Sequence, residues 1–165
     1  MVTIAPAAPG DAVTILDIQK RAFAPEARLC DDWDIMPMTE PLDAVAGHIR
    51  DQTVLAAREE GVIIGSIRGL LAGTVCTIRG LSVEPAHHGR GIGKSLLLAI
   101  EQAHLGVTHF ELTTNTVMDS NVRFYERHGY HIYELTRHSE RITLAQMRKA
   151  TGEGGCKLAP VWSAL

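Results

Sequence analysis

The segment that most restricts the fold is Val83–Ser95, where an apolar run passes through closely spaced glycines and enters a helix-forming run. Gly89, Gly91 and Gly93 stand at alternate positions, and the residues that follow read Ser-Leu-Leu-Leu-Ala-Ile-Glu. A strand that turns through such glycines into a helix directs free backbone N–H groups and the positive end of the helix dipole toward one point. The segment therefore predicts a binding site for a phosphate or pyrophosphate group.

Two common nucleotide-binding patterns do not fit this segment. The Rossmann pattern GxGxxG needs two residues before its last glycine, whereas here one residue separates Gly91 from Gly93, and no acid follows at the expected strand end. A P-loop needs a glycine five positions before its Gly-Lys-Ser, and His88 occupies that position ahead of Gly93-Lys94-Ser95. A turn that needs glycine only for its backbone conformation stays open as the alternative.

Composition restricts the class of protein. A chain of 165 residues is long enough for one domain with a sizeable core. The net charge of -3 argues against a nucleic-acid partner, and no apolar run is long enough for a transmembrane helix. The N-terminus has no basic or apolar region typical of a secretory signal. Cys30, Cys76 and Cys156 contain no CxxC motif, so we expect reduced thiols and a cytoplasmic location.

Hydrophobic periodicity predicts a single mixed α/β domain over residues 1–150, followed by a tail over 151–165. Pro25 is expected to end the first helix. The strand after the glycine turn is expected to pair parallel with the last strand of an antiparallel meander, because a helix separates the two. The elements expected are helices over 11–23, 42–49, 93–104 and 120–128, and strands over 53–58, 62–70, 75–84, 109–114, 130–137 and 142–149.

A second motif identifies what the anion site holds. Residues 121–130 read Asn-Val-Arg-Phe-Tyr-Glu-Arg-His-Gly-Tyr. With Leu81-Ser82-Val83 and the glycine turn, this segment resembles the GNAT family of N-acetyltransferases, whose motifs are Val-x-Pro-x-x-Gln/Arg-Gly-x-Gly-x-Gly and Phe/Leu-Tyr-Glu-x-x-Gly-Phe/Tyr. The resemblance covers residues 3–149. It implies an α/β (α+β) fold of the GNAT-like acyl-CoA N-acyltransferase type, with a mixed central sheet of about six to seven strands and flanking helices.

The resemblance also implies acetyl-CoA as co-substrate. The pantetheine arm would bond to the backbone before the glycine turn as if it were an added strand, which requires the parallel pair to splay, commonly with a bulge. The pyrophosphate would lie on the backbone N–H groups of the turn, with Arg90 or Lys94 adding charge. The cofactor-binding residues so implied are Leu81, Ser82, Val83, His88, Gly89, Arg90, Gly91, Ile92, Gly93, Lys94, Ser95 and Asn121.

The chain departs from the family pattern at two positions. His88 stands where the family has Gln or Arg, but its backbone N–H would do the binding. Met118 stands where many members have Asn, which leaves Asn115 and Asn121 as alternative contacts for CoA or the acceptor.

Acetyl transfer to an amine requires further groups. The amine must lose a proton before attack, the oxyanion needs N–H donors, and the CoA thiolate leaves best when it is protonated. The family motif places Tyr125 beside the sulfur as the catalytic acid; the alternative is that this ring only packs. No base is identified, and the six acids against one base between Glu26 and Asp43 form either an acceptor wall or a solvated loop. Glu84 is expected to be structural.

Two functions remain open at this point. The first is an N-acetyltransferase that acts by direct attack of a primary amine, on a small molecule or on a peptide or protein. The second is a non-catalytic acyl-CoA-binding module. We expect no metal, because His128-x-x-His131 is the only pair near ligand spacing. A homodimer is predicted from the final hairpin and the apolar residues 158–162.

Overall fold

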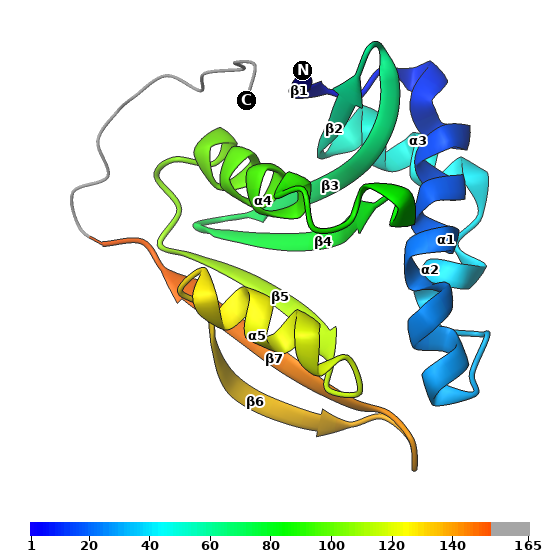
Figure 1. Ribbon diagram of the computed structural model, residues 1–165. Helices are drawn as coiled ribbons and strands as arrows, with labels where there is room; N and C mark the ends of the chain where they lie inside the picture. The colour runs from blue at the N-terminus through cyan, green and yellow to red at the C-terminus, as the bar shows by residue number, and fades with distance from the viewer. Residues whose placement is uncertain (153–165) are drawn as a thin grey trace.

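The computed structural model of the protein describes residues 1–152. They form a seven-stranded sheet in the order β1-β2-β3-β4-β5-β7-β6, which confirms the expected mixed sheet of six to seven strands (Figure 1). The strands are β1 (Val2–Pro6), β2 (Thr53–Glu59), β3 (Val62–Ala72), β4 (Val75–Val83), β5 (His109–Asn115), β6 (His131–Arg137) and β7 (Thr143–Ala150). The helices are α1 (Ala12–Cys30), α2 (Met36–Thr39), α3 (Leu42–Asp51), α4 (Ile92–Ala103) and α5 (Asp119–Arg127).

Helices cover both faces of the sheet and enclose two cores. Helix α4 packs on β2, β3 and β4, and α5 packs on β5 (Figure 1). Their shared core contains fully buried side chains such as Leu96, Ile100 and Met147. Helices α1 and α3 pack on β2, β3 and β4 over a second core that includes Ile15, Ile18 and Val45. The sheet therefore lies between two helical layers, as its apolar residues require.

The strand pairings agree with the predicted meander and crossover. Strands β2, β3 and β4 pair antiparallel in sequence order. Strand β5 pairs parallel with β4, after the crossover through α4. Strand β7 then pairs antiparallel with both β5 and β6.

Two expectations about the N-terminal region were wrong. Helix α1 does not end before Pro25 but continues to Cys30, with Pro25 exposed inside it. The lost backbone hydrogen bond falls on the solvent side, and burial of Ala27 and Cys30 in the last turns holds the helix together beyond it. We also did not predict β1, which pairs antiparallel with β2 at the sheet edge.

The C-terminal predictions are tested only in part. The final hairpin is present as β6 and β7, and every residue of β6 is exposed at the sheet edge. The apolar residues 158–162, on which the dimer prediction partly depends, lie outside the described residues. The boundary at residue 150 stays a prediction.

None of the helices within residues 1–152 has the length and hydropathy that a bilayer span needs.

Candidate active site

The site is built where β4 and β5 part. These strands pair only over Val75–Thr77 with His109–Glu111, so beyond Thr77 the edge of β4 that faces β5 has no strand partner among the described residues (Figure 1). The predicted splay is confirmed. An extended chain that lies along this edge finds backbone N–H and C=O groups free to pair, as an added strand would.

A bulge in β4 accompanies the splay, as expected. Ser66 pairs with Ser82 and Arg68 with Arg79, so β4 has one more residue than β3 over this interval. Gly80 lies in the bulge with a φ of +61°, a conformation that only glycine adopts without strain. The hydroxyl of Ser82 donates to the carbonyl of Gly80 at 3.3 Å, so the residues just after the bulge are held in place.

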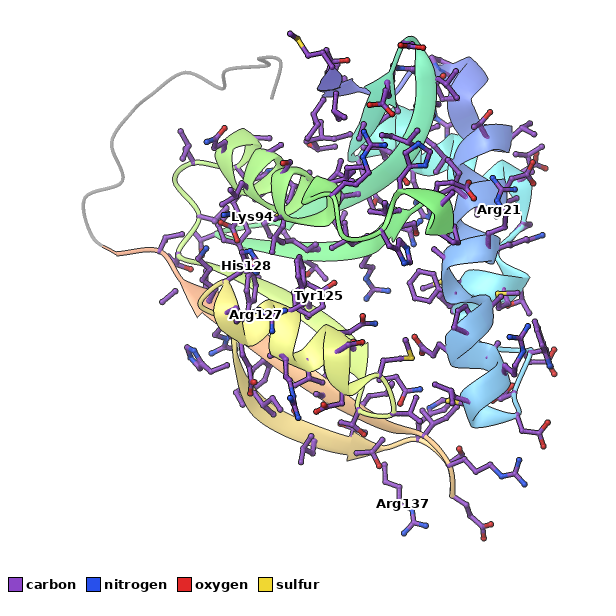
Figure 2. All side chains as sticks on the ribbon, viewed as in Figure 1. Arg21, Lys94, Tyr125, Arg127, His128 and Arg137 are labelled. Carbon is purple, nitrogen blue, oxygen red and sulfur yellow. The ribbon has the colours of Figure 1, made fainter. Side chains whose placement is uncertain are left out.

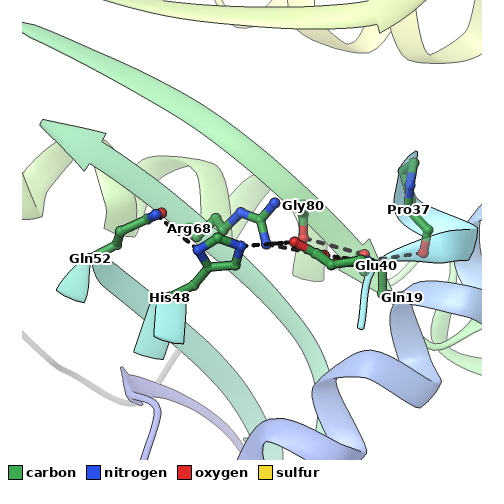
Figure 3. Close-up of polar contacts among 8 residues, drawn as sticks. Gln19, Pro37, Glu40, His48, Gln52, Arg68 and Gly80 are labelled. Carbon is green, nitrogen blue, oxygen red and sulfur yellow. Dashed lines mark hydrogen bonds and ion pairs between the residues drawn. The ribbon is translucent and has the colours of Figure 1, made fainter. Parts of the chain in front are cut away.

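A buried polar cluster supports the bulge from the α1 face (Figure 3). Glu40 accepts hydrogen bonds from Arg68 at 3.0 and 3.2 Å and from Gln19 at 2.8 Å. His48 Nε2 lies 2.8 Å from Glu40 Oε1, the oxygen that Arg68 bonds at 3.0 Å, whereas Gln19 bonds Oε2. A Cβ at Gly80 would lie 3.5 Å from Gln19 Oε1 and 3.8 Å from Arg68 Nε, so the cluster packs directly against the bulge.

The glycine turn has the conformation that an anion site needs. Gly89 and Gly91 have φ of +75° and +77°, and Gly91 is the residue before α4. The first helical hydrogen bond of α4 joins Ser95 N–H to Gly91 C=O, so the N–H groups of the preceding turn have no partner within the helix. The fit to a pyrophosphate is good, because no Cβ fills the space beside Gly89 or Gly91.

Of Arg90 and Lys94, only Lys94 has no ion pair with another described residue. Arg90 is bound to Glu59 of β2 at 2.6 and 3.0 Å. Lys94, in the first turn of α4, is exposed and has no ion pair among the described residues (Figure 2). We therefore propose Lys94, rather than Arg90, as the cation that contacts the phosphate.

We expect Lys94→Ala to raise the Kd for CoA about tenfold, because it removes a charge-assisted contact to phosphate. The matched variant Arg90→Ala should change the Kd by less than about threefold, because Glu59 already neutralises that side chain. Calorimetric titration at two salt concentrations measures both. A larger loss in Arg90→Ala than in Lys94→Ala would reverse the assignment.

The strand segment before the turn is close-packed against β3. A Cβ at Gly65 of β3 would lie 2.8 Å from the carbonyl oxygen of Ser82, 3.2 Å from Leu96 Cδ1 and 3.5 Å from Val83 Cα. The imidazole of His88 lies 3.0 Å from the carbonyl oxygen of Val83. The family resemblance implies that the backbone of Val83 bonds to the pantetheine arm. The backbone N–H of His88, expected to bind the anion, instead donates to the carbonyl of Pro85 at 3.2 Å, so the contact of His88 in this structure is through its side chain.

We expect Gly65→Ala to destabilise the fold by about 1–3 kcal/mol, because the new methyl group must push the β4 backbone at Ser82. Binding of CoA should weaken with it. Gly47→Ala in α3, where the nearest atom is the flexible Arg50 Nη2 at 3.5 Å, is the control and should be neutral or stabilising. Urea unfolding compares the two; an unaltered midpoint for Gly65→Ala would contradict the packing argument.

Helix α5 brings Tyr125 to the same place. A Cβ at Gly93 would lie 3.8 Å from Phe124 Cζ and 3.8 Å from Val83 Cγ2, so α5 meets the start of α4 beside the end of β4. Tyr125 points from α5 toward β4 and packs edge-on against Phe124 and Tyr130 (Figure 2). Burial and the nearby charge of Glu26 raise the pKa of the Tyr125 phenol, which keeps it protonated at neutral pH.

Comparison with known proteins agrees with this geometry. The family profile described as the acetyltransferase (GNAT) domain matches residues 50–132, just over half of the chain. The chain belongs to the GNAT acetyltransferase family. A search of curated protein sequences finds no match.

Solved structures of GNAT proteins share the fold. The ribosomal-protein-S18-alanine N-acetyltransferase of Escherichia coli superposes with a TM-score of 0.76 at 18% identity, covering 96% of this chain and 99% of that one. The yncA protein of Salmonella typhimurium, solved with its cofactor acetyl-CoA, gives 0.72 at 19% identity over 96% and 99%. The PaiA N-acetyltransferase of Thermoplasma acidophilum, solved with coenzyme A, gives 0.67 at 17% over 92% and 99%.

The two asparagines that the GNAT motif left as alternatives differ in what they contact. Asn115, at the end of β5, is buried, and its amide donates to Glu26 Oε1 at 3.2 Å and to Cys30 Sγ at 3.1 Å. Its oxygen accepts from the Val117 N–H. Asn121 makes no side-chain hydrogen bond among the described residues, so the CoA contact is proposed for Asn121.

The acids between Glu26 and Asp43 of this GNAT domain do not share one environment, so they form neither a single acceptor wall nor a single solvated loop. Glu40 is buried in the cluster of Figure 3, and Asp31 pairs with Arg141 of the β6–β7 turn at 2.6 Å. Asp32 accepts from the backbone of Asp34. Glu26 is the acid of the segment that bonds to the end of β5 in the described structure, through Asn115.

Sequence reasoning missed two groups of contacts. Glu84, expected to be structural, binds Arg21 through both carboxylate oxygens and so ties the glycine turn to α1 (Figure 2). The Glu26–Asn115 pair was missed because Pro25 led us to end the helix before it. His128 Nδ1 bonds to the carbonyl oxygen of Phe124 at 2.7 Å. This bond stabilises the last turn of α5, so His128 has a structural role.

Proposed function

We propose that this protein transfers the acetyl group of acetyl-CoA to a primary amine by direct attack. The observation that carries the proposal is the meeting of three parts at one point: the unpaired edge of β4, the glycine turn before α4, and Tyr125 of α5. The edge suits the pantetheine arm along Leu81, Ser82 and Val83. The turn suits the pyrophosphate on the N–H groups between His88 and Ser95.

The chemistry then follows from the position of each group. Backbone N–H groups beside the bulge would stabilise the oxyanion that forms when an amine attacks the thioester carbonyl. Tyr125 would give its proton to sulfur as the C–S bond breaks. Its protonated state at neutral pH supports this role.

Acetyl-dependent release of thiol tests the function. Purified protein is mixed with acetyl-CoA and one of four amines, and free CoA is followed with a disulfide dye. The amines are spermidine, tyramine, lysine and a peptide with N-terminal alanine, the last because one structural neighbour is named as an alanine N-acetyltransferase. We expect thiol release and an acetylated product by mass with at least one class. Tight CoA binding without thiol release would favour the non-catalytic module instead.

The cytoplasmic location stays a prediction. Cys30 and Cys76 are free and buried, and Cys156 lies outside the described residues. Burial and the charge of Glu101 raise the pKa of the Cys76 thiol to about 11, so this thiol has no nucleophilic role at neutral pH.

A further inference from the structure

Glu26 reaches across from α1 to the point where β5 leaves β4. Its Oε1 accepts from Asn115 Nδ2 at 3.2 Å, although the two residues are far apart in sequence. Asn115 cannot turn freely, because its oxygen is bonded to the Val117 N–H and its nitrogen also contacts Cys30 Sγ at 3.1 Å. The buried amide therefore fixes where the carboxylate lies.

Glu26 differs from the other buried or half-buried glutamates of the described structure. Glu40 pairs with Arg68, Glu84 with Arg21 and Glu59 with Arg90. Glu26 has no cationic partner among the described residues, and its only hydrogen bond is to a neutral amide. A partly desolvated carboxylate without a cation favours either a proton or a cationic ligand.

Burial raises the pKa of the Glu26 carboxyl, and the bond from Asn115 offsets only part of that effect. Burial first, and then the charge of Glu26, raise the pKa of the Tyr125 phenol. The Asn115 amide from β5 is the group that bonds to Glu26, and the same amide contacts the Cys30 thiol of α1. The Tyr125 phenol of α5 is the titratable group on which the Glu26 charge acts.

We propose that Glu26 binds the acceptor as an ammonium ion and takes its proton before attack, with Asn115 as the residue that positions the carboxylate. This inference rests on the proposed acetyl transfer. It makes the acceptor a cationic primary amine, and it assigns the base that sequence reasoning left unidentified.

The steps balance with these two residues alone. The ammonium gives one proton to the Glu26 carboxylate, and the free amine attacks the thioester carbonyl carbon. The C–N bond forms and the C–S bond breaks, with sulfur leaving with the bonding electrons. Sulfur takes the Tyr125 proton, and the second proton lost by nitrogen restores the phenol. The products are a neutral amide, CoA thiol and a protonated Glu26, which returns its proton to solvent.

The two roles support each other electrostatically. Once Glu26 is protonated, it no longer carries the charge that raises the pKa of Tyr125. The phenol then becomes a stronger acid just when the thiolate forms. Deprotonation of the amine and protonation of the sulfur are therefore coupled through one carboxylate.

Glu26→Gln tests the proposal, because it keeps the size and the bond to Asn115 but removes charge and basicity. With spermidine, tyramine or the alanine peptide, whichever the wild type acetylates, kcat/KM should fall about 10²-fold or more, with acetyl-CoA KM unchanged. Hydroxylamine is a nucleophile that is already largely unprotonated at neutral pH and needs no base. Its kcat/KM should change by less than about threefold.

Further variants separate this role from a structural one. Asp34→Asn removes an exposed acid of the same segment and should leave every rate unchanged. Asn115→Ala should produce a smaller loss with the same split between cationic amines and hydroxylamine. If Glu26→Gln loses equal activity with both nucleophiles, or keeps full activity toward cationic amines, only the assignment of Glu26 as the base is overturned. Absence of thiol release by the wild type with every amine and with hydroxylamine would instead overturn acetyl transfer itself.

Discussion

Replacing Glu40 by alanine should lower the free energy of unfolding by about 3–5 kcal/mol, one of the largest effects expected from a single substitution in this chain. The Glu40 side chain is 5% exposed and that of its partner Arg68 is 9% exposed. Removing the carboxylate leaves a buried guanidinium whose Nε already has no hydrogen-bond partner in the described structure. Equilibrium unfolding in urea measures the loss.

Two further variants test whether the unpaired charge of Arg68 causes the loss of stability in Glu40→Ala. Asp119→Ala breaks the exposed pair with Arg123, in which both side chains are 68% exposed, and should cost no more than about 0.5 kcal/mol. The double variant Glu40→Leu/Arg68→Met removes both charges and should recover most of the stability. If the double variant is as unstable as Glu40→Ala, the unpaired charge is not the cause.

The same carboxylate predicts a pH dependence. Burial would raise the pKa of Glu40, but the bond from Gln19, the charge of Arg68 and the bonds from His48 and Arg68 together lower it below 4.5. The folded state thus binds the proton of the Glu40 carboxyl more weakly than the unfolded state does. The ionised carboxylate therefore contributes its full stability above about pH 4.5. The advantage of wild type over Glu40→Gln should shrink as the pH falls from 4.5 through the lowered pKa.

Tyr125→Phe should lower kcat for acetyl transfer about 10²-fold, with little change in the KM for acetyl-CoA. The ring and its edge-on contacts with Phe124 and Tyr130 remain, so only the hydroxyl proton is lost. Steady-state rates at saturating amine and acetyl-CoA give both constants. An unchanged kcat would remove Tyr125 from the mechanism and leave it as a packing residue.

Tyr130→Phe is the matched control, since it removes another buried phenol from the same aromatic group. Its hydroxyl donates to Glu101 Oε1 of α4 at 2.7 Å, so its proton is held in a structural bond. Loss of this bond to a charged group should cost about 1.5–3 kcal/mol of stability and leave kcat unchanged. A similar fall in kcat for both variants would indicate a general packing effect.

Local patterns and the family resemblance together predicted the strands, the splay and the turn on which the proposed donor site rests. The meander and its parallel partner followed from period-two runs and from the helix between them, and the splay and bulge followed from the family resemblance. Gly89 and Gly91 have the positive φ that favours glycine, whereas Gly93 lies inside α4. The conformation of this turn depends on residues close together in sequence, whose backbone preferences act before any tertiary contact forms.

The edge strand and the first helix were predicted less well. Strand β1 is only five residues long, which is too short for a clear period-two pattern. It forms because it pairs antiparallel with β2. Pro25 is a strong local signal to end a helix. Here burial of Ala27 and Cys30 outweighs the one hydrogen bond that proline removes.

The acceptor side was decided by tertiary structure. Within the acidic run, Glu26 lies beside Asn115, Asp31 binds Arg141 and Glu40 is buried with Arg68. Each partner comes from a distant strand or turn, and composition alone does not distinguish these acids. The glycine turn of residues 83–95 thus predicted an anion site from sequence because its chemistry lies in its own backbone, and the GNAT resemblance of residues 121–130 implied acetyl-CoA as its ligand. The proposed base emerged only from the folded chain, because a carboxylate acquires its pKa and its partner from what surrounds it.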